Sequence, residues 1–79
     1  MVNSDSLLAF LEEDLGVDID DVDADTPLFS SQLVDSFALV TLMMFLEKQT
    51  GIRIAPTDVN LDNMDTIARM LAYVERVAL

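Results

Sequence analysis

The chain has 79 residues, of which 52% are hydrophobic, and its fifteen acidic and four basic side chains give a net charge of −11. Such a charge argues against binding to nucleic acid or to an anionic membrane surface, because both of these are negatively charged. The sequence contains no cysteine and no histidine. A thiolate nucleophile, a zinc–sulfur site and the commonest general base are thereby excluded.

The same composition favours a small acidic module that meets other proteins. We expect a single domain over residues 1–79, with no catalytic residues and no metal site of its own. The sequence shows no signal-peptide pattern, and its longest nearly apolar stretch, residues 37–46, is about half of what a bilayer span needs. We therefore expect a cytoplasmic protein without membrane insertion.

The first predicted helix covers residues 4–15. Its leucines recur at helical spacing and form one apolar stripe, which consists of Leu7, Leu8, Leu11 and Leu15. Asn3 or Ser4 can cap its beginning, and Gly16 is suited to end it in a left-handed conformation. Residues 17–34 follow as a long, aspartate-rich loop. We expect this loop to lie across a helical core, held by the apolar side chains Val17, Ile19, Val22, Leu28, Phe29 and Leu33.

The second predicted helix runs from Ser36 to Thr50, with Asp35 as its N-cap and Gly51 as its stop. It is apolar on nearly all sides, whereas a surface helix of a small domain needs only one apolar stripe. The stripe that better suits the core consists of Leu39, Leu42, Met43 and Leu46. The opposite stripe is either covered by the long loop or left for a partner, and it consists of Phe37, Val40, Thr41 and Met44.

The rest of the chain predicts one more long helix. Residues 52–54 favour a short extended segment, and Pro56 can open a short helical turn over residues 57–60. The last helix is expected from Asp65 to about Val77. One of its faces carries Ile67, Met70, Leu71, Val74 and Ala78, and another carries Arg69, Tyr73 and Arg76. The predicted fold class is all-α: a small antiparallel four-helix bundle with one short helix and a long loop between the first two helices.

The aspartate-rich loop partly matches a calcium-binding pattern. Asp21, Asp23 and Asp25 occupy the first three acidic positions of an EF-hand loop. The sixth position requires glycine and the twelfth glutamate, but Thr26 and Gln32 stand there. The pattern therefore favours a solvated acidic loop over a calcium site.

Ser36 is the most informative residue of the sequence. It follows Asp35 at the predicted start of the second helix, where free N–H groups and the positive end of the helix dipole suit a phosphate group. A catalytic Ser–Lys pair is excluded by distance, since Lys48 lies about 18 Å away along the same helix. Taken alone, an aspartate–serine pair at a helix start is more often a pair of simple helix caps.

The surroundings of Ser36 resemble the acyl carrier protein family along essentially the whole chain. The similarity lies in Leu28-Phe29, Asp35-Ser36-Phe37, the apolar second helix, Glu47, Gly51-Ile52-Arg53-Ile54 and Asp65-Thr66-Ile67. The resemblance implies a four-helix bundle in which Ser36 receives phosphopantetheine from coenzyme A. The thiol of this arm then holds an acyl or aminoacyl group as a thioester. Leu33-Val34 before the motif and Phe37 after it look closer to D-alanyl and small aminoacyl carriers than to fatty-acid carriers.

On this resemblance the chain is a freestanding carrier protein and not an enzyme. The implied partners are a phosphopantetheinyl transferase, an acyl- or aminoacyl-activating ligase and a downstream acyl-transfer enzyme. Asp35 is expected to contact the transferase, and the expected docking face for partners consists of Phe37, Val40, Thr41 and Met44. Alternatively, the chain is an acidic protein–protein adaptor without a prosthetic group, or a degenerate carrier that no longer accepts the arm. A further alternative buries Phe37 under the long loop as part of the core.

Overall fold

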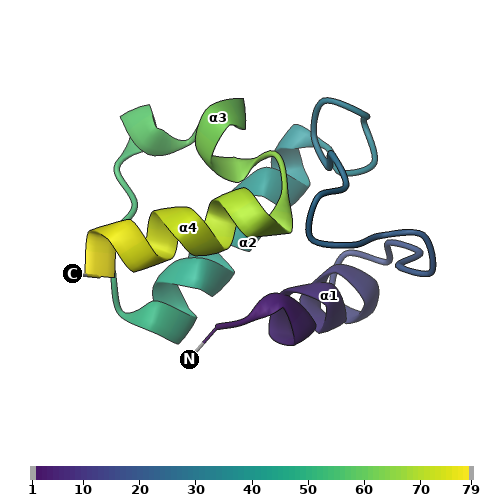
Figure 1. Cartoon of the computed structure of the whole chain (residues 1–79), viewed down its shortest axis with the longest axis horizontal. Coiled ribbons are helices and arrows are strands. Elements are labelled where there is room, and N and C mark those ends of the chain that lie inside the picture. Colours follow the sequence, from purple (N-terminus) through teal and green to yellow (C-terminus); the bar gives the residue numbers. More distant parts are fainter. Residues whose placement is uncertain (1, 79) are drawn as a thin grey trace.

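The computed structural model of the protein describes residues 2–78, and these residues form helices joined by loops (Figure 1). α4 lies across α2, and α1 lies beside this pair (Figure 1). The fold agrees with the predicted all-α class. In chain order the elements are α1 (Ser4–Glu13), α2 (Ser36–Thr50), a 3-10 turn (Pro56–Asp58), α3 (Leu61–Met64) and α4 (Ile67–Ala78).

α1 begins as predicted but ends two residues early. Asn3 is its N-cap, and its side chain accepts a hydrogen bond from the Ser6 N–H at 2.9 Å while Ser6 Oγ accepts one from the Asn3 N–H. The helix ends at Glu13 and not at Leu15. The reason is Gly16, whose φ of 69° turns the chain so that the Val17 N–H reaches the Leu11 carbonyl at 2.9 Å.

α2 has the predicted boundaries. The Asp35 side chain accepts a hydrogen bond from the Ala38 N–H at 2.8 Å, which fixes the first turn. Gly51 ends the helix with a φ of 73°, a left-handed conformation that glycine adopts without strain. The two cap residues that the sequence shows most clearly, Asp35 and Gly51, therefore define both ends of the helix that carries Ser36.

The segment between α2 and α4 differs from the prediction. The expected turn over residues 57–60 is a 3-10 turn that begins at Pro56, and the four-residue α3 follows it, capped by Asn60. α4 begins at Ile67 and not at Asp65, because Thr66 is the residue whose side chain caps it: Thr66 Oγ1 accepts from the Arg69 N–H at 3.0 Å.

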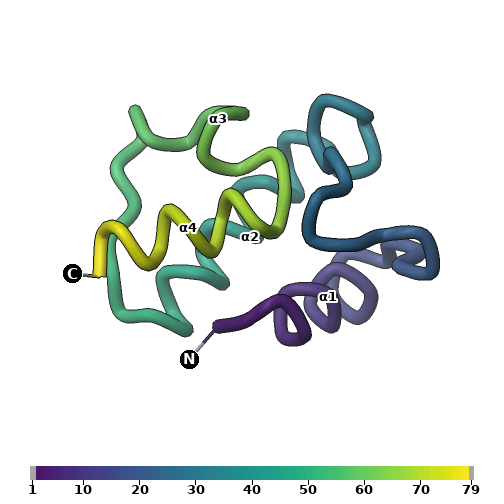
Figure 2. The backbone as a smooth tube through the Cα atoms, viewed as in Figure 1, coloured from purple at the N-terminus to yellow at the C-terminus, as the bar shows by residue number. Residues whose placement is uncertain are grey.

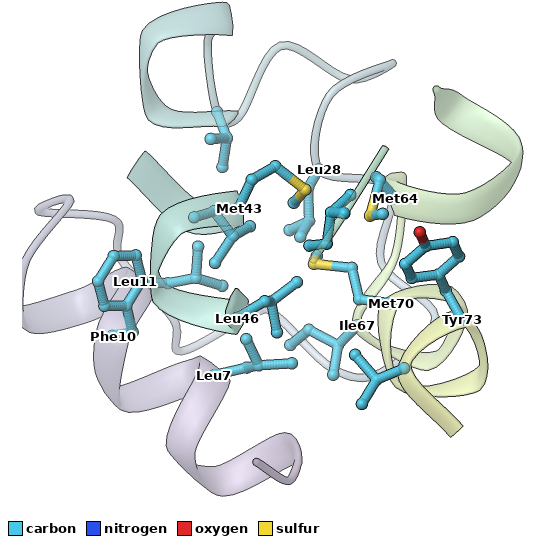
Figure 3. Packing of buried hydrophobic residues seen from close by; sticks show 14 residues of the cluster. Leu7, Phe10, Leu11, Leu28, Met43, Leu46, Met64, Ile67, Met70 and Tyr73 are labelled. Atoms are coloured by element: carbon cyan, nitrogen blue, oxygen red, sulfur yellow. The ribbon is translucent and has the colours of Figure 1, made fainter. Parts of the chain in front are cut away.

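The core lies between α1, α2 and α4, and Figure 3 shows its side chains pointing toward one another. The loop contributes Leu28, which is fully buried. Phe10 of α1 stacks on Phe45 of α2 with ring centroids 4.2 Å apart. The buried apolar residues are Leu7, Phe10, Leu11, Leu28, Val34, Leu42, Met43, Leu46, Ile54, Met64, Ile67, Met70, Tyr73 and Val74.

Tyr73 belongs to this core, although the helical spacing predicts that it shares a face of α4 with Arg69 and Arg76. Tyr73 is 2% exposed, and its hydroxyl donates a hydrogen bond to Asp58 Oδ2 at 2.8 Å. Burial, together with this carboxylate, raises the pKa of Tyr73. The bond ties α4 to the 3-10 turn, while Arg69 and Arg76 reach α3 through the Leu61 carbonyl and the Asn63 side chain.

The long loop runs from the end of α1 to the start of α2 along one side of the helices, as the tube in Figure 2 shows. Several expected anchors pack against the core: Val17, Ile19, Val22, Leu28 and Phe29. Leu33 does not, since it is 41% exposed, and its neighbour Val34 is buried in its place. None of the helices within residues 2–78 combines the length and the apolar character that crossing a membrane requires.

Candidate functional site

Ser36 is the first residue of α2, and its side chain is exposed. Asp35 satisfies the backbone N–H of Ala38 with its carboxylate and that of Leu39 with its carbonyl. The N–H groups of Ser36 and Phe37 remain at the open end of the helix, where the first donors have no intrahelical partner. The Ser36 hydroxyl thus lies beside two donors and the positive end of a fifteen-residue helix, an environment that suits a phosphodiester.

An open hollow of ≈ 490 Å³ lies next to this serine. Its wall opposite α2 comes from the loop, which turns sharply there: the Gln32 N–H donates to the Phe29 carbonyl at 3.1 Å, and Gln32 has a φ of 63°. A positive φ is unusual for a residue other than glycine. The hollow is lined by Phe29, Gln32, Val34, Asp35, Ser36 and Leu39.

Asp65 holds this wall in place. Its Oδ1 accepts hydrogen bonds from the N–H groups of Phe29 and Ser30, both at 2.9 Å, and its Oδ2 accepts one from Ser30 Oγ at 2.7 Å. The bonds from Ser30, and then that from Phe29, lower the pKa of the Asp65 carboxyl against the opposing effect of its burial. The sequence suggested only that Asp65 begins the last helix, because no local pattern reveals a partner 35 residues away in the chain.

The predicted docking face of α2 is exposed. Phe37 is 85% exposed, Val40 60% and Met44 64%, and Thr41 is exposed as well. Phe37 is therefore not buried under the loop, and that alternative is wrong. The opposite stripe forms the core as expected, except that Leu39 is only half-buried; the buried members are Leu42, Met43 and Leu46.

A second hollow, of ≈ 280 Å³, adjoins the exposed face of α2 and is bordered by the segment that follows the helix. Glu47 is its one acidic side chain, and Glu47 Oε2 accepts a hydrogen bond from the Ile54 N–H at 2.8 Å. This bond fixes residues 52–54 against the helix. The lining consists of Leu39, Val40, Met43, Met44, Glu47, Ile54, Pro56 and Val59.

The aspartates of the long loop hold local turns. Asp18 Oδ1 accepts from the Asp20 N–H at 3.1 Å, and Asp23 Oδ1 accepts from the Asp25 N–H at 2.9 Å and from Thr26 Oγ1 at 3.1 Å. Side chains of this kind stabilise turns by bonding to backbone two residues on. Within residues 2–78 no group of three or more histidine, cysteine, aspartate or glutamate side chains is arranged to hold a metal ion.

Comparison with known proteins identifies the family. The chain matches the family described as "Phosphopantetheine attachment site" over residues 5–74. It is 34% identical over 58 residues to the probable acyl carrier protein PigG of Serratia sp., and this match covers 73% of this chain and 67% of that protein. It is 32% identical over 72 residues to the D-alanyl carrier protein of Abiotrophia defectiva, and this match covers 91% of each chain.

A solved structure also shares the fold. One chain of a structure titled "Crystal structure of FAD-dependent dehydrogenase" superposes with a TM-score of 0.76 and 28% sequence identity. The match covers 86% of this chain and 97% of that chain.

The family match agrees with the exposed serine, the free helix N-terminus and the adjoining hollow. Carrier proteins of this family are non-catalytic, and they work with phosphopantetheinyl transferases and with acyl-activating or acyl-transfer enzymes. Their chemistry comes from the attached cofactor, which explains how a chain without cysteine or histidine takes part in acyl transfer. The chain belongs to the phosphopantetheine attachment family and is a carrier protein for acyl or aminoacyl groups.

Proposed function

We propose that Ser36 is the residue to which phosphopantetheine is attached. The observation that carries this assignment is the exposed Ser36 hydroxyl at the first position of α2, beside the free N–H groups of Ser36 and Phe37. A phosphodiester on Ser36 Oγ is stabilised there by these donors and by the helix dipole. Asp35 keeps the helix start in shape through its bond to Ala38, so that the backbone that carries Ser36 is held in one conformation.

The attached arm supplies a thiol on which an acyl or aminoacyl group is held as a thioester. The protein's own residues bind and present this group without reacting with it. The open hollow beside Ser36 leaves room for the first part of the arm.

We assign partner docking to the exposed face of α2. This face begins directly after Ser36, so a partner that reaches for the serine or the arm meets it first. Phe37 and Met44 expose large apolar surface at its two ends, with Val40 and Thr41 between them. Asp35, exposed beside Ser36, is the contact that we assign to the transferase.

The partners that we propose are a phosphopantetheinyl transferase, an acyl- or aminoacyl-activating ligase and a downstream enzyme that consumes the carried group. A cytoplasmic location follows from this set of partners, since the donor of the arm is coenzyme A.

Intact-mass measurement tests the assignment of Ser36. After incubation with coenzyme A and a broad-specificity phosphopantetheinyl transferase, the wild-type mass should rise by about 340 Da, the mass of one covalently attached phosphopantetheine. Ser36→Ala should remain unmodified. Ser31→Ala is the matched control, since Ser31 is an exposed serine of the loop that precedes α2, and it should be modified like the wild type.

The same experiment distinguishes the alternatives. A folded wild-type protein that gains no mass would favour the adaptor or the degenerate carrier over the proposed function. Modification that persists in Ser36→Ala would place the attachment at another residue.

A further inference from the structure

Asp65 is buried and bonded to residues far away in the chain, although it lies in a short connection between two helices. It lies between α3 and α4, where an exposed polar residue would suffice, yet it is only 8% exposed. Three hydrogen bonds join it to Phe29 and Ser30, and its carbonyl accepts a fourth from the Leu28 N–H at 2.7 Å. Asp65 therefore fastens residues 28–30 of the long loop to the start of α4.

The fastened segment leads directly to Ser36. The Val34 N–H donates to the Leu28 carbonyl at 2.9 Å, which closes residues 28–34 into a loop whose two ends are held together. Val34 is buried, and the chain passes from it straight into Asp35 and Ser36. Phe29 and Val34, one near each end of the closed loop, form part of the hollow beside Ser36. The position of this wall is thus set through Asp65.

We propose that Asp65 is a positioning residue for the modification of Ser36, acting through the closed loop of residues 28–34. The inference rests on the proposed attachment at Ser36. In that reaction Ser36 Oγ forms a bond to the phosphorus next to the pantetheine of coenzyme A, and the pyrophosphate bond breaks. Adenosine 3′,5′-bisphosphate leaves, and the hydroxyl proton passes to the transferase. Asp65 touches none of these atoms.

Removal of the Asp65 carboxylate should change how Ser36 is presented to the transferase and leave the start of α2 intact. In Asp65→Ala the N–H groups of Phe29 and Ser30 lose their acceptor, so the wall beside Ser36 is no longer held in one place. Asp35 still caps α2, because its bond to Ala38 is independent of Asp65. Small displacements of a reacting group cost large factors in rate, so we expect kcat/KM for modification to fall by about tenfold or more. A fall in kcat should account for most of this loss, because the reacting hydroxyl is misplaced while the docking face of α2 is unchanged.

The experiment measures modification kinetics with coenzyme A and a broad-specificity transferase, well below the melting temperature of each variant. Asp65→Asn should restore most of the rate, because its amide oxygen can still accept from both N–H groups. Asp58→Ala is the matched control: it removes the acceptor of the Tyr73 hydroxyl, a carboxylate contact with α4 that does not involve the loop. A merely structural role for Asp65 predicts equal effects in Asp65→Ala and Asp58→Ala.

Hydrogen exchange gives an independent readout. The amides of Phe29, Ser30 and Val34 should exchange faster in Asp65→Ala, while those of α2 stay protected. If Asp65→Ala does not fold, Ser30→Ala removes the bond to Asp65 Oδ2 alone and should give a smaller loss in the same direction. Wild-type kinetics in folded Asp65→Ala, or in Ser30→Ala where Asp65→Ala does not fold, would overturn the inference and leave the assignment of Ser36 intact. A wild-type protein that is not modified at Ser36 would instead remove the assignment itself.

Discussion

The two sides of α2 are made of similar residues but have opposite surroundings. Leu42 and Leu46 are fully buried and Met43 is 7% exposed, whereas Phe37, Val40 and Met44 are mostly exposed. The adjacent methionines show the difference most clearly, because Met43 faces the core and Met44 faces outward. The apolar side chains therefore pack into the core on one side of α2 and are exposed on the other.

This difference supports the proposal that partners dock on one side of a single helix. A helix that is apolar all round is ordinarily buried all round. Here the long loop covers neither Phe37 nor Met44, and the exposed residues begin next to Ser36. An exposed apolar patch is typical of a surface that binds partners, and this one lies beside the proposed attachment site. Mutations on the buried side of α2 should consequently lower stability, and mutations on its exposed side should weaken partner binding.

The largest expected effect is on stability, from the buried side. Leu42→Ala should lower the free energy of unfolding by about 2–5 kcal/mol, because it leaves a cavity in the core. Phe37→Ala should change it by no more than about 0.5 kcal/mol, as for other exposed positions. Urea unfolding followed by circular dichroism measures both. A comparable loss in Phe37→Ala would place that ring in the core and remove the contrast between the two sides.

The next largest effect is on partner docking, from the exposed side. Phe37→Ala and Met44→Ala should each weaken binding to the cognate ligase by over about 1 kcal/mol, roughly fivefold or more in KM for the carrier. Gln49→Ala is a control on the same helix. Gln49 is exposed but lines a hollow with Phe10 of α1 and not with the docking face. Loading assays give the KM values.

Docking through apolar contact should also resist salt. At about 0.5 M sodium chloride the Debye length is roughly 4 Å, which screens exposed charges but not apolar contacts. The Phe37→Ala effect should therefore persist there. Loss of binding at this salt concentration would indicate a mainly electrostatic interface.

Acid should loosen the loop before it loosens the buried side of α2. The pKa of Asp65 is lower in the folded protein than in the unfolded chain, so the folded state resists its protonation. Its contribution to stability is complete above the unfolded value of about 3.9 and is lost as the pH falls through the folded pKa. The difference in unfolding free energy between wild type and Asp65→Asn should shrink below about pH 4. A difference that stays constant down to pH 2 would contradict the role of the ionised carboxylate.

The smallest effect is expected from Gln32→Gly in the loop wall. Gln32 has a φ of 63°, a conformation that is strained in a side-chain-bearing residue. Gln32→Gly should leave stability unchanged or raise it by up to about 1 kcal/mol, because relief of strain is partly offset by the freer unfolded chain. Gln32→Val should lower stability by about 1–2 kcal/mol. A stability loss in Gln32→Gly as large as in Gln32→Val would show that the side chain, and not the backbone, matters there.

Much of the site follows from the sequence because its signals are local. Asp35 and Gly51 are strong cap residues, and they define α2 correctly at both ends. The spacing of Phe37 and Met44 places them on one face, and that face is exposed as one of the two sequence alternatives expected. The family resemblance, carried by Asp35-Ser36-Phe37 and its surroundings, is confirmed by the match over residues 5–74.

The features that the sequence does not reveal depend on contacts between distant residues. Asp65 is indistinguishable from an N-cap until its partners in the loop are known, and Thr66 is the actual cap of α4. α3 has only four residues, too few for a helical pattern to appear. Tyr73 can be buried because Asp58 accepts its hydroxyl hydrogen bond, and nothing in the spacing of α4 indicates that acceptor.

Methyl NMR of the methionines tests most directly the claim that one side of α2 packs the core while the other meets partners. Met43, Met64 and Met70 are buried, whereas Met44 is 64% exposed, so the methyl groups report the two sides separately. On titration with the transferase or the cognate ligase, the Met44 methyl should shift while the methyls of Met43, Met64 and Met70 keep their positions. An unchanged Met44 signal in a saturated complex, or shifts of equal size at the buried methionines, would contradict the account.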